Sequence, residues 1–141
     1  MPVIPVAKDG KTYALFICGR PELPAEGPER SRGVKFFTKP TDEFQLGVIE
    51  RPKGYEVKPH AHPERHATIN GTAEFLYVEK GKIQITIFDE QWKEIGQQTV
   101  SSGDFLLFLA GGHALTMLED TRLIEVKQGP YPGDAQAKVY R

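Results

Sequence analysis

Three of the four histidines lie in one short stretch, where two of them are separated by a single alanine. These two are His60 and His62, and His66 follows shortly after them. On an extended strand, residues two apart project to the same face and lie roughly 6.6 Å apart. Two imidazoles on one face can converge on a metal ion that takes each nitrogen at about 2.0–2.1 Å. The alternative is that both histidines are exposed polar residues beside Pro59 and Pro63.

A carboxylate and one more imidazole stand at the ends of other predicted strands. Glu74 opens the apolar run "EFLYVEKG", where a charge is out of place. His113 follows the residues "AGG", which come directly after the apolar run "FLLFL". A β-barrel could bring both side chains beside the histidine pair. Nitrogen and oxygen ligands without a thiolate suit Fe, Mn, Ni, Co, Cu or Zn.

The segments that carry these residues resemble two motifs of the cupin family. The first motif is a glycine, five residues, His-x-His, and then a glutamate separated by six residues from a glycine. "GYEVKPHAH" followed by "EFLYVEKG" supplies it with Gly54, His60, His62, Glu74 and Gly81. "GDFLLFLAGGH" is similar to the second motif, with Gly103, Gly111 and His113. The resemblance extends from Gly54 to Lys127.

This resemblance implies an all-β cupin fold, a double-stranded β-helix or jelly-roll barrel, with one divalent metal ion on His60, His62, Glu74 and His113. The motif glutamate follows here after the eleven residues "PERHATINGTA", so Glu64 and His66 are alternatives to Glu74. The strand and turn context of "EFLYVEKG" favours Glu74. The metal could be Fe, Mn, Zn or Ni, and its identity stays open.

Three imidazoles and one carboxylate leave coordination positions open for water or for a small polar ligand. Such a site could activate water, polarise a carbonyl group, or bind dioxygen if the metal is iron. Glu125 and Lys127 alternate with Ile124 and Val126, and they are candidate catalytic residues. On a face that lines the cavity, Glu125 could be a general base and Lys127 could hold an anionic or hydroxylated substrate. If Ile124 and Val126 face the core instead, Glu125 and Lys127 are exposed to water. The apolar character of Ile124 and Val126 favours this second alternative.

Short apolar runs separated by turn residues predict an all-β protein with few helices. Ile83, Ile85 and Ile87 alternate with polar residues, which indicates a strand with one buried face. The run "FLLFL" is apolar on both faces, which predicts burial between layers or at a subunit contact. The predicted strands span residues 12–19, 33–38, 44–50, 54–62, 74–81, 82–88, 97–100, 104–112, 114–118 and 122–129.

The length of 141 residues fits a single domain. We expect residues 1–50 to form N-terminal strands and a loop, residues 51–128 the barrel, and residues 129–141 a tail. The balance of 18 basic against 19 acidic residues argues against nucleic-acid or membrane partners. The single cysteine, Cys18, and a start without a basic segment and long apolar run predict a cytoplasmic protein. Exposed strand edges predict a homodimer, in which the N-terminal strand could complete the sheet of the partner.

The sequence supports three hypotheses about function. The first is a metal-dependent enzyme, either an oxygenase or an isomerase, lyase or hydrolase of carbohydrate-like substrates. The second is a cupin that binds a small sugar-like molecule without converting it. The third is a structural barrel whose main task is dimerisation. An acid or base within reach of the ligand distinguishes the first from the second.

Overall fold

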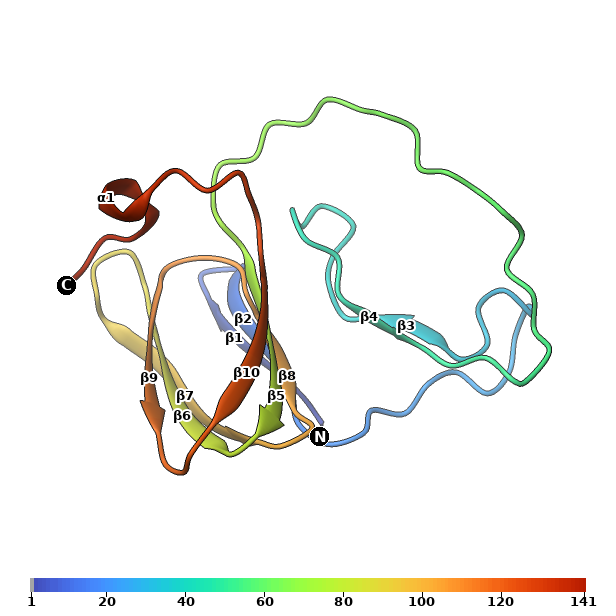
Figure 1. Cartoon of the computed structure of the whole chain (residues 1–141), viewed down its shortest axis with the longest axis horizontal. Helices are drawn as coiled ribbons and strands as arrows, with labels where there is room; N and C mark the ends of the chain where they lie inside the picture. Colours follow the sequence, from blue (N-terminus) through green and yellow to red (C-terminus); the bar gives the residue numbers. More distant parts are fainter. Residues whose placement is uncertain (1) are drawn as a thin grey trace. The chain divides into compact units, whose positions relative to one another are not determined.

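A computed structural model of the chain describes residues 2–141, which are nearly all β. In this part of the chain, ten strands form three antiparallel sheets, and one short helix lies near the C-terminus (Figure 1). The prediction of an all-β protein is therefore confirmed. The described strands do not close into a single barrel, and the jelly-roll topology stays a prediction. The elements are β1 (Val3–Lys8), β2 (Lys11–Ile17), β3 (Val34–Phe36), β4 (Gly47–Ile49), β5 (Glu74–Lys80), β6 (Lys82–Phe88), β7 (Glu94–Ser101), β8 (Phe105–Phe108), β9 (Gly112–Met117), β10 (Arg122–Lys127) and α1 (Asp134–Ala137).

The chain divides into two compact units. Unit 1 combines the residues up to Pro21 with Gly71–Arg141, and unit 2 is the intervening segment Glu22–Asn70. Every buried apolar residue of the core lies in unit 1. The two units are described separately below.

Two sheets of unit 1 share one hydrophobic core. The five-stranded sheet has the order β1-β2-β8-β5-β10, and the three-stranded sheet has the order β7-β6-β9. Ile83, Ile85 and Ile87 of β6 are at most 1% exposed, as their alternation predicts, and they pack with Leu76 and Leu106 of the larger sheet. We call the face of each sheet that meets this core its inner face. Strand β8 is central in its sheet and is buried on both faces, which agrees with its uninterrupted apolar sequence.

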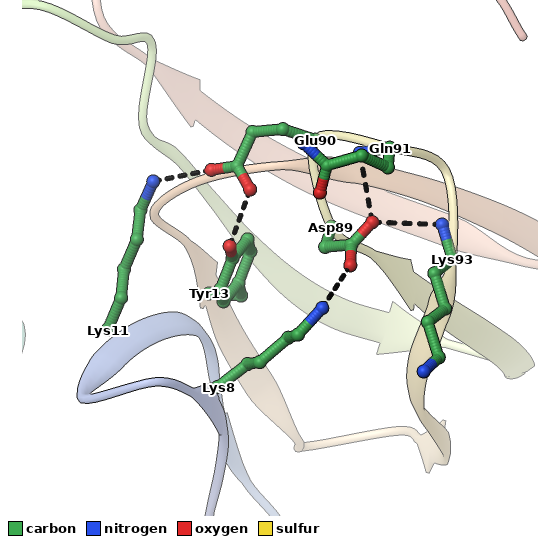
Figure 2. Close-up of polar contacts among 7 residues, drawn as sticks. All are labelled: Lys8, Lys11, Tyr13, Asp89, Glu90, Gln91 and Lys93. Carbon is green, nitrogen blue, oxygen red and sulfur yellow. Dashed lines mark hydrogen bonds and ion pairs between the residues drawn. The ribbon is translucent and has the colours of Figure 1, made fainter.

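A polar clasp joins the two sheets at the turn between β6 and β7. The pairing of β1 with β2 shifts by one residue between Val6 and Ala7, which leaves Tyr13 as an extra residue on β2. Such a bulge redirects a side chain. The Tyr13 hydroxyl donates to Glu90 Oε2 at 2.5 Å, and Lys11 donates to Glu90 Oε1 (Figure 2). The turn is thereby attached to β2.

Asp89 completes this clasp from a buried position. Its carboxylate is 2% exposed and accepts a hydrogen bond from Lys8 Nζ at 2.6 Å. The other oxygen accepts from the backbone N–H groups of Gln91 and Lys93, both at 2.9 Å (Figure 2). Because both oxygens are engaged within the chain, the clasp is a structural feature that closes one end of the sheet pair.

Unit 2 contains little regular structure. Strands β3 and β4 form a short hairpin of three residue pairs. The guanidinium of Arg51 donates to the carbonyls of Arg32 at 2.7 Å and Arg30 at 2.9 Å, and it lies 4.4 Å from the ring centre of Tyr55. One arginine therefore ties the loop before β3 to the segment after β4.

Two sequence predictions about strands are wrong. Residues 54–62 form no strand, and two prolines in and beside this segment, Pro59 and Pro63, remove backbone donors that a ladder would need. Strand β1 was not among the predicted strands, and it pairs with β2 of its own chain. Pro5 lies within β1, where a proline is tolerated because β1 is an edge strand.

No helix in residues 2–141 is long and apolar enough to cross a membrane.

Candidate functional site

The candidate site lies in unit 1, where polar side chains replace the apolar ones on the inner faces of the two sheets. On the five-stranded sheet, Glu74 pairs with Phe108 on one side and with Lys127 on the other. These three residues therefore form one row across β8, β5 and β10. In the next row, Leu106 of β8 and Leu76 of β5 are apolar and belong to the core, and Glu125 of β10 pairs with Leu76, so Glu74 stands at the edge of the core.

His113 approaches Glu74 from the three-stranded sheet. It pairs with the buried Ile87, which places its imidazole on the inner face of β9. His113 Nε2 lies 3.5 Å from Glu74 Oε2. The ring stacks on Phe108, with 3.8 Å between ring centres and 5° between ring planes. The stacking fixes the plane of the imidazole and directs its nitrogen toward the carboxylate.

Burial weakens the charged form of both groups. The Glu74 side chain is 17% exposed and that of His113 is 30% exposed. Burial raises the pKa of Glu74, and the nearby charge of Glu125 raises it further, whereas Lys127 and Lys138 lower it. Burial lowers the pKa of His113. The imidazole is therefore neutral over a wide pH range, and a neutral imidazole is the form that binds metal ions.

Glu125 and Lys127 lie on the inner face of β10, beside Glu74. Glu125 pairs with the buried Leu76, and its charge contributes to the raised pKa of Glu74. Lys127 Nζ lies 3.8 Å from Glu125 Oε1. Both side chains keep partial contact with solvent, at 34% exposure for Lys127 and 43% for Glu125. They are thus within reach of a ligand that enters beside Glu74.

The expectation that Ile124 and Val126 would face the core is wrong. These side chains are 47% and 51% exposed and lie on the outer face, in register with Tyr77 and Phe75. Both faces of β10 contain apolar residues, because Leu123 packs against the core on the inner side. The alternation alone therefore could not decide which face lines the site.

Lys138 is a residue whose charge influences the candidate site and which the sequence analysis did not identify. It follows α1, and its positive charge lowers the pKa of both Glu74 and His113. No periodic pattern or motif marks this lysine. It lies in a tail rich in glycine and proline, for which the sequence predicts a position only on the surface.

His60 and His62 lie together in unit 2. Their ring centres are 5.4 Å apart and their planes are inclined by 62°. His60 Nδ1 is 2.8 Å from the carbonyl oxygen of Lys58. Because a carbonyl oxygen can only accept, Nδ1 carries the proton and Nε2 keeps a free lone pair. Both histidines are exposed, as are Glu64 and His66.

The structure thus brings together four of the six predicted site residues, namely Glu74, His113, Glu125 and Lys127. The remaining two, His60 and His62, contact each other in the separately described unit 2. Among residues 2–141, no group of three or more histidine, cysteine, aspartate or glutamate side chains is arranged to hold a metal ion. The four-ligand metal site therefore stays a prediction.

Comparison of the chain with protein-family models, with curated proteins and with solved structures gave no match. The chemistry of the site is therefore argued from its own residues.

Proposed function

We propose that this chain is a cupin-like metal-dependent enzyme of the isomerase or lyase type that acts on a small polar, carbohydrate-like molecule. One divalent ion would be held by Glu74 and His113, with His60 and His62 as the further ligands that the resemblance to the cupin motifs implies. The observation that carries the proposal is the contact between Glu74 and His113, made across two facing sheets with Glu125 alongside.

The donor atoms suit this assignment. Glu74 supplies carboxylate oxygens and His113 a neutral imidazole from a half-buried position, where an unpaired charge would be costly. His60 keeps the lone pair of Nε2 because Nδ1 donates to a carbonyl. When bound, a divalent ion of this kind supplies a Lewis acid that polarises a carbonyl oxygen.

The side chains next to these ligands support proton transfer. Lys127 binds an anionic or hydroxylated group of the substrate. The Glu125 carboxylate takes a proton from the hydroxyl-bearing carbon beside the carbonyl group and returns it to the carbonyl carbon. The proton of that hydroxyl group passes to the carbonyl oxygen, so that no proton is gained or lost overall. An acid–base group within reach of the ligand position favours an enzyme over a protein that only binds. It also favours isomerase or lyase chemistry over oxygenation, which does not need such a group.

Metal content of variants tests the ligand set. Stoichiometric metal in the wild-type protein should be lost in His60→Ala/His62→Ala, in Glu74→Gln and in His113→Ala, as measured by elemental analysis of protein purified without chelators or nickel columns. Glu79→Gln is the matched control, because Glu79 lies on the same strand and forms an ion pair with Arg122 away from Glu74 and His113. Circular dichroism should show unchanged β content throughout.

The same experiment separates the alternative ligands. Glu64→Gln and His66→Ala should retain the metal; if one of them loses it while Glu74→Gln retains it, the assignment of Glu74 is wrong. Metal content that is unchanged in the double histidine variant would refute the site as a whole.

A second readout separates the enzyme from a binding protein. Metal-loaded protein is incubated with aldoses and ketoses in deuterated water, and proton NMR follows deuterium entering the carbon beside the carbonyl group. Exchange should occur with the wild-type protein and be lost in Glu125→Gln, whereas saturable binding without exchange would identify a sugar-binding protein.

The homodimer also stays a proposal, and the exposed Ile124 and Val126 on the edge strand β10 are residues that such a contact would cover.

A further inference from the structure

Strand β10 has one edge without a partner in the larger sheet of unit 1. Among the strands of residues 2–141, it pairs only with β5. Five of its six residues are exposed, and only Leu123 is partly buried. An edge strand presents a row of backbone N–H and C=O groups that can pair with another extended chain. The free edge of β10 is therefore a candidate surface for association.

The hydrogen bonds of the β5–β10 ladder decide which residues of β10 face this free edge. In an antiparallel pair, residues bonded to the neighbouring strand alternate with residues whose backbone groups point away from it. The N–H of Gln128 donates to the carbonyl of Ala73 at 3.2 Å, so Gln128 belongs to the bonded set. The register is regular from Leu123 to Lys127. Glu125 and Lys127 therefore direct their N–H and C=O groups toward the free edge.

The side chains of β10 suit a second copy of the same strand. Ile124 and Val126 lie on the outer face and are 47% and 51% exposed, so a strand added at this edge would cover apolar surface. On the inner face, Glu125 and Lys127 have opposite charges and stand two positions apart. A copy of β10 that runs antiparallel can therefore place a lysine opposite each glutamate.

We infer that two copies of the chain associate through antiparallel pairing of β10 with β10, with Val126 opposite the partner's Val126 on a two-fold axis. This register places Glu125 opposite the partner's Lys127, and Lys127 opposite the partner's Glu125. The inference rests on the homodimer proposed above and names its contact. It depends neither on the metal ion nor on the reaction.

Charge favours this register over its neighbours. Opposite charges that face each other across two strands stabilise the pairing, and like charges in such positions destabilise it. An axis at Glu125 would place two carboxylates opposite each other, and an axis at Lys127 would do the same with two ammonium groups. An axis at Ile124 would place Glu125 opposite the partner's Leu123. Only the axis at Val126 forms both pairs of opposite charge.

The other end of the same sheet does not offer an equivalent edge. The edge strand there is β1, in which the N–H of Cys18 donates to the carbonyl of Pro2 at 2.7 Å. By the same alternation, the backbone of Pro5 faces the free edge, because the register is regular from Val3 to Val6. Proline has no N–H to donate. Association through β10 therefore closes at two copies and does not continue into a fibre.

The contact would also bring a residue of the partner to the candidate site. Glu125 lies on the inner face of β10, where its charge raises the pKa of Glu74. In the proposed register, the partner's Lys127 lies opposite Glu125. The dimer thus adds an ammonium group to the open side of the site.

Cysteine cross-linking tests the register. In a Cys18→Ser background, Val126→Cys should form an intermolecular disulfide under mild oxidation. Opposed residues that are not hydrogen-bonded have Cα atoms about 4.5 Å apart, within the range of about 4.4–6.8 Å that a disulfide spans. Non-reducing electrophoresis and mass spectrometry measure the linked fraction.

Ile124→Cys in the same background is the matched control. Ile124 lies on the same face as Val126 and is almost equally exposed. In the proposed register it lies opposite the partner's Gln128, so that the two copies of Ile124 are displaced by four residues, about 13 Å along the strand. This variant should remain unlinked.

Exchange of the charges tests the pairing without added cysteines. Glu125→Lys and Lys127→Glu each turn both attractive pairs into repulsive ones. Each variant should raise the dissociation constant of the dimer by at least about tenfold in sedimentation velocity experiments. A mixture of the two variants restores opposite charges and should form a mixed dimer with nearly the wild-type affinity. Lys82→Glu, which makes the same change on β6, should dimerise like the wild-type protein.

The outcomes separate this contact from the rest of the proposal. Wild-type protein that stays monomeric throughout the concentration series would overturn the contact together with the homodimer, while metal content and deuterium exchange still test the site. A dimer in which neither or both cysteine variants cross-link, or in which the two charge variants do not associate, would overturn the β10 contact alone. Circular dichroism of every variant should show unchanged β content.

Discussion

At the scale of single residues, Tyr13 and Glu90 shift the pKa values of each other through the hydrogen bond that joins the two sheets. The hydrogen bonds from Lys11 and, second, from Tyr13 lower the pKa of Glu90 to about 2, and the bond to Glu90 raises the pKa of Tyr13 to about 12. The lowered pKa of Glu90 stabilises the fold above its ordinary value of 4.5, and this contribution is lost as the pH falls toward 2. The raised pKa of Tyr13 stabilises the fold below 10.0, and this contribution is lost as the pH rises through 12.

Absorbance titration of the tyrosines tests this pair. One of the five tyrosines should ionise near pH 12 in the wild-type protein, and that step should move toward 10 in Glu90→Gln. In Tyr13→Phe the late step should disappear, while Tyr140→Phe, which changes an exposed ring, should keep it. A late step that persists in Tyr13→Phe would assign the shifted pKa to another tyrosine.

The site residues could be predicted where they interrupt a run of apolar residues or alternate with apolar residues. Glu74 and His113 interrupt apolar runs, and the structure places them in contact. Glu125 and Lys127 were recognised as sharing a face, but the direction of that face was not predictable, because apolar residues lie on both sides of β10. The influence of Lys138 on the pKa values of Glu74 and His113 depends on the path of the tail, which no pattern of side chains encodes.

At the scale of elements, the turn between β8 and β9 decides where His113 points. Gly111 lies in this turn with a φ of +67°, and a Cβ atom there would overlap the carbonyl oxygen of Phe88 and the ring of Tyr13. A shift of one residue in this turn would move His113 to the opposite face of β9. The glycine therefore maintains both the packing of the turn and the position of the His113 imidazole on the inner face of β9.

Alanine at Gly111 should destabilise the protein more than alanine at Gly103. Gly103 also has a positive φ, of +93°, but a Cβ atom there would meet nothing within 4 Å. Gly103→Ala should therefore lower the free energy of unfolding by ~1–2 kcal/mol from backbone strain alone. Gly111→Ala adds the overlap and should lower it by at least ~1 kcal/mol more, within the usual cost of overpacking. Urea denaturation measures both, and equal losses would show that the turn relaxes around the added methyl group.

The strands that were predicted well have an uninterrupted pattern of apolar residues in the sequence. The period of two in 82–88 and the apolar run 105–109 both correspond to strands, β6 and β8. Residues 54–62 were predicted as a strand, but they have no neighbouring strand to pair with and form no ladder. β1 was not among the predicted strands, and it contains Pro5, which an edge strand tolerates.

At the scale of the whole molecule, the two units differ in how their backbone is held. Unit 1 contains the core and eight of the ten strands, whereas unit 2 has only β3 and β4, each of three residues. Segments with few backbone hydrogen bonds in sheets or helices open more readily, and proteases cleave such segments first.

Limited digestion with trypsin should therefore cut unit 2 before the strands of unit 1. The earliest fragments, identified by mass spectrometry, should end at Arg30, Arg32, Lys53 or Arg65. Lys80 and Lys82, at the junction of β5 and β6, should resist cleavage. Cleavage after Lys138, in the exposed tail, removes only residues 139–141 and does not bear on the comparison. Early cleavage at Lys80 or Lys82 would contradict this difference in local stability.

The division of the chain into these units was not visible in the sequence. Composition and length predicted one domain, since the turn-rich segment 21–33 resembles an ordinary surface loop. What separates residues 22–70 is the absence of buried apolar side chains, and burial depends on which strands pair across the chain. Pairing between distant segments is the property that local patterns predict least well.

The route of the chain through its larger sheet has a consequence during synthesis on the ribosome. Strand β2 ends at Ile17, but its neighbour β8 begins only at Phe105, so one edge of the early hairpin has no partner until most of the polypeptide has emerged. Contacts between such distant segments form slowly, and an open apolar edge invites association with other nascent chains. Expression yield should thus depend on translation speed and chaperone supply more than on the strength of the finished fold.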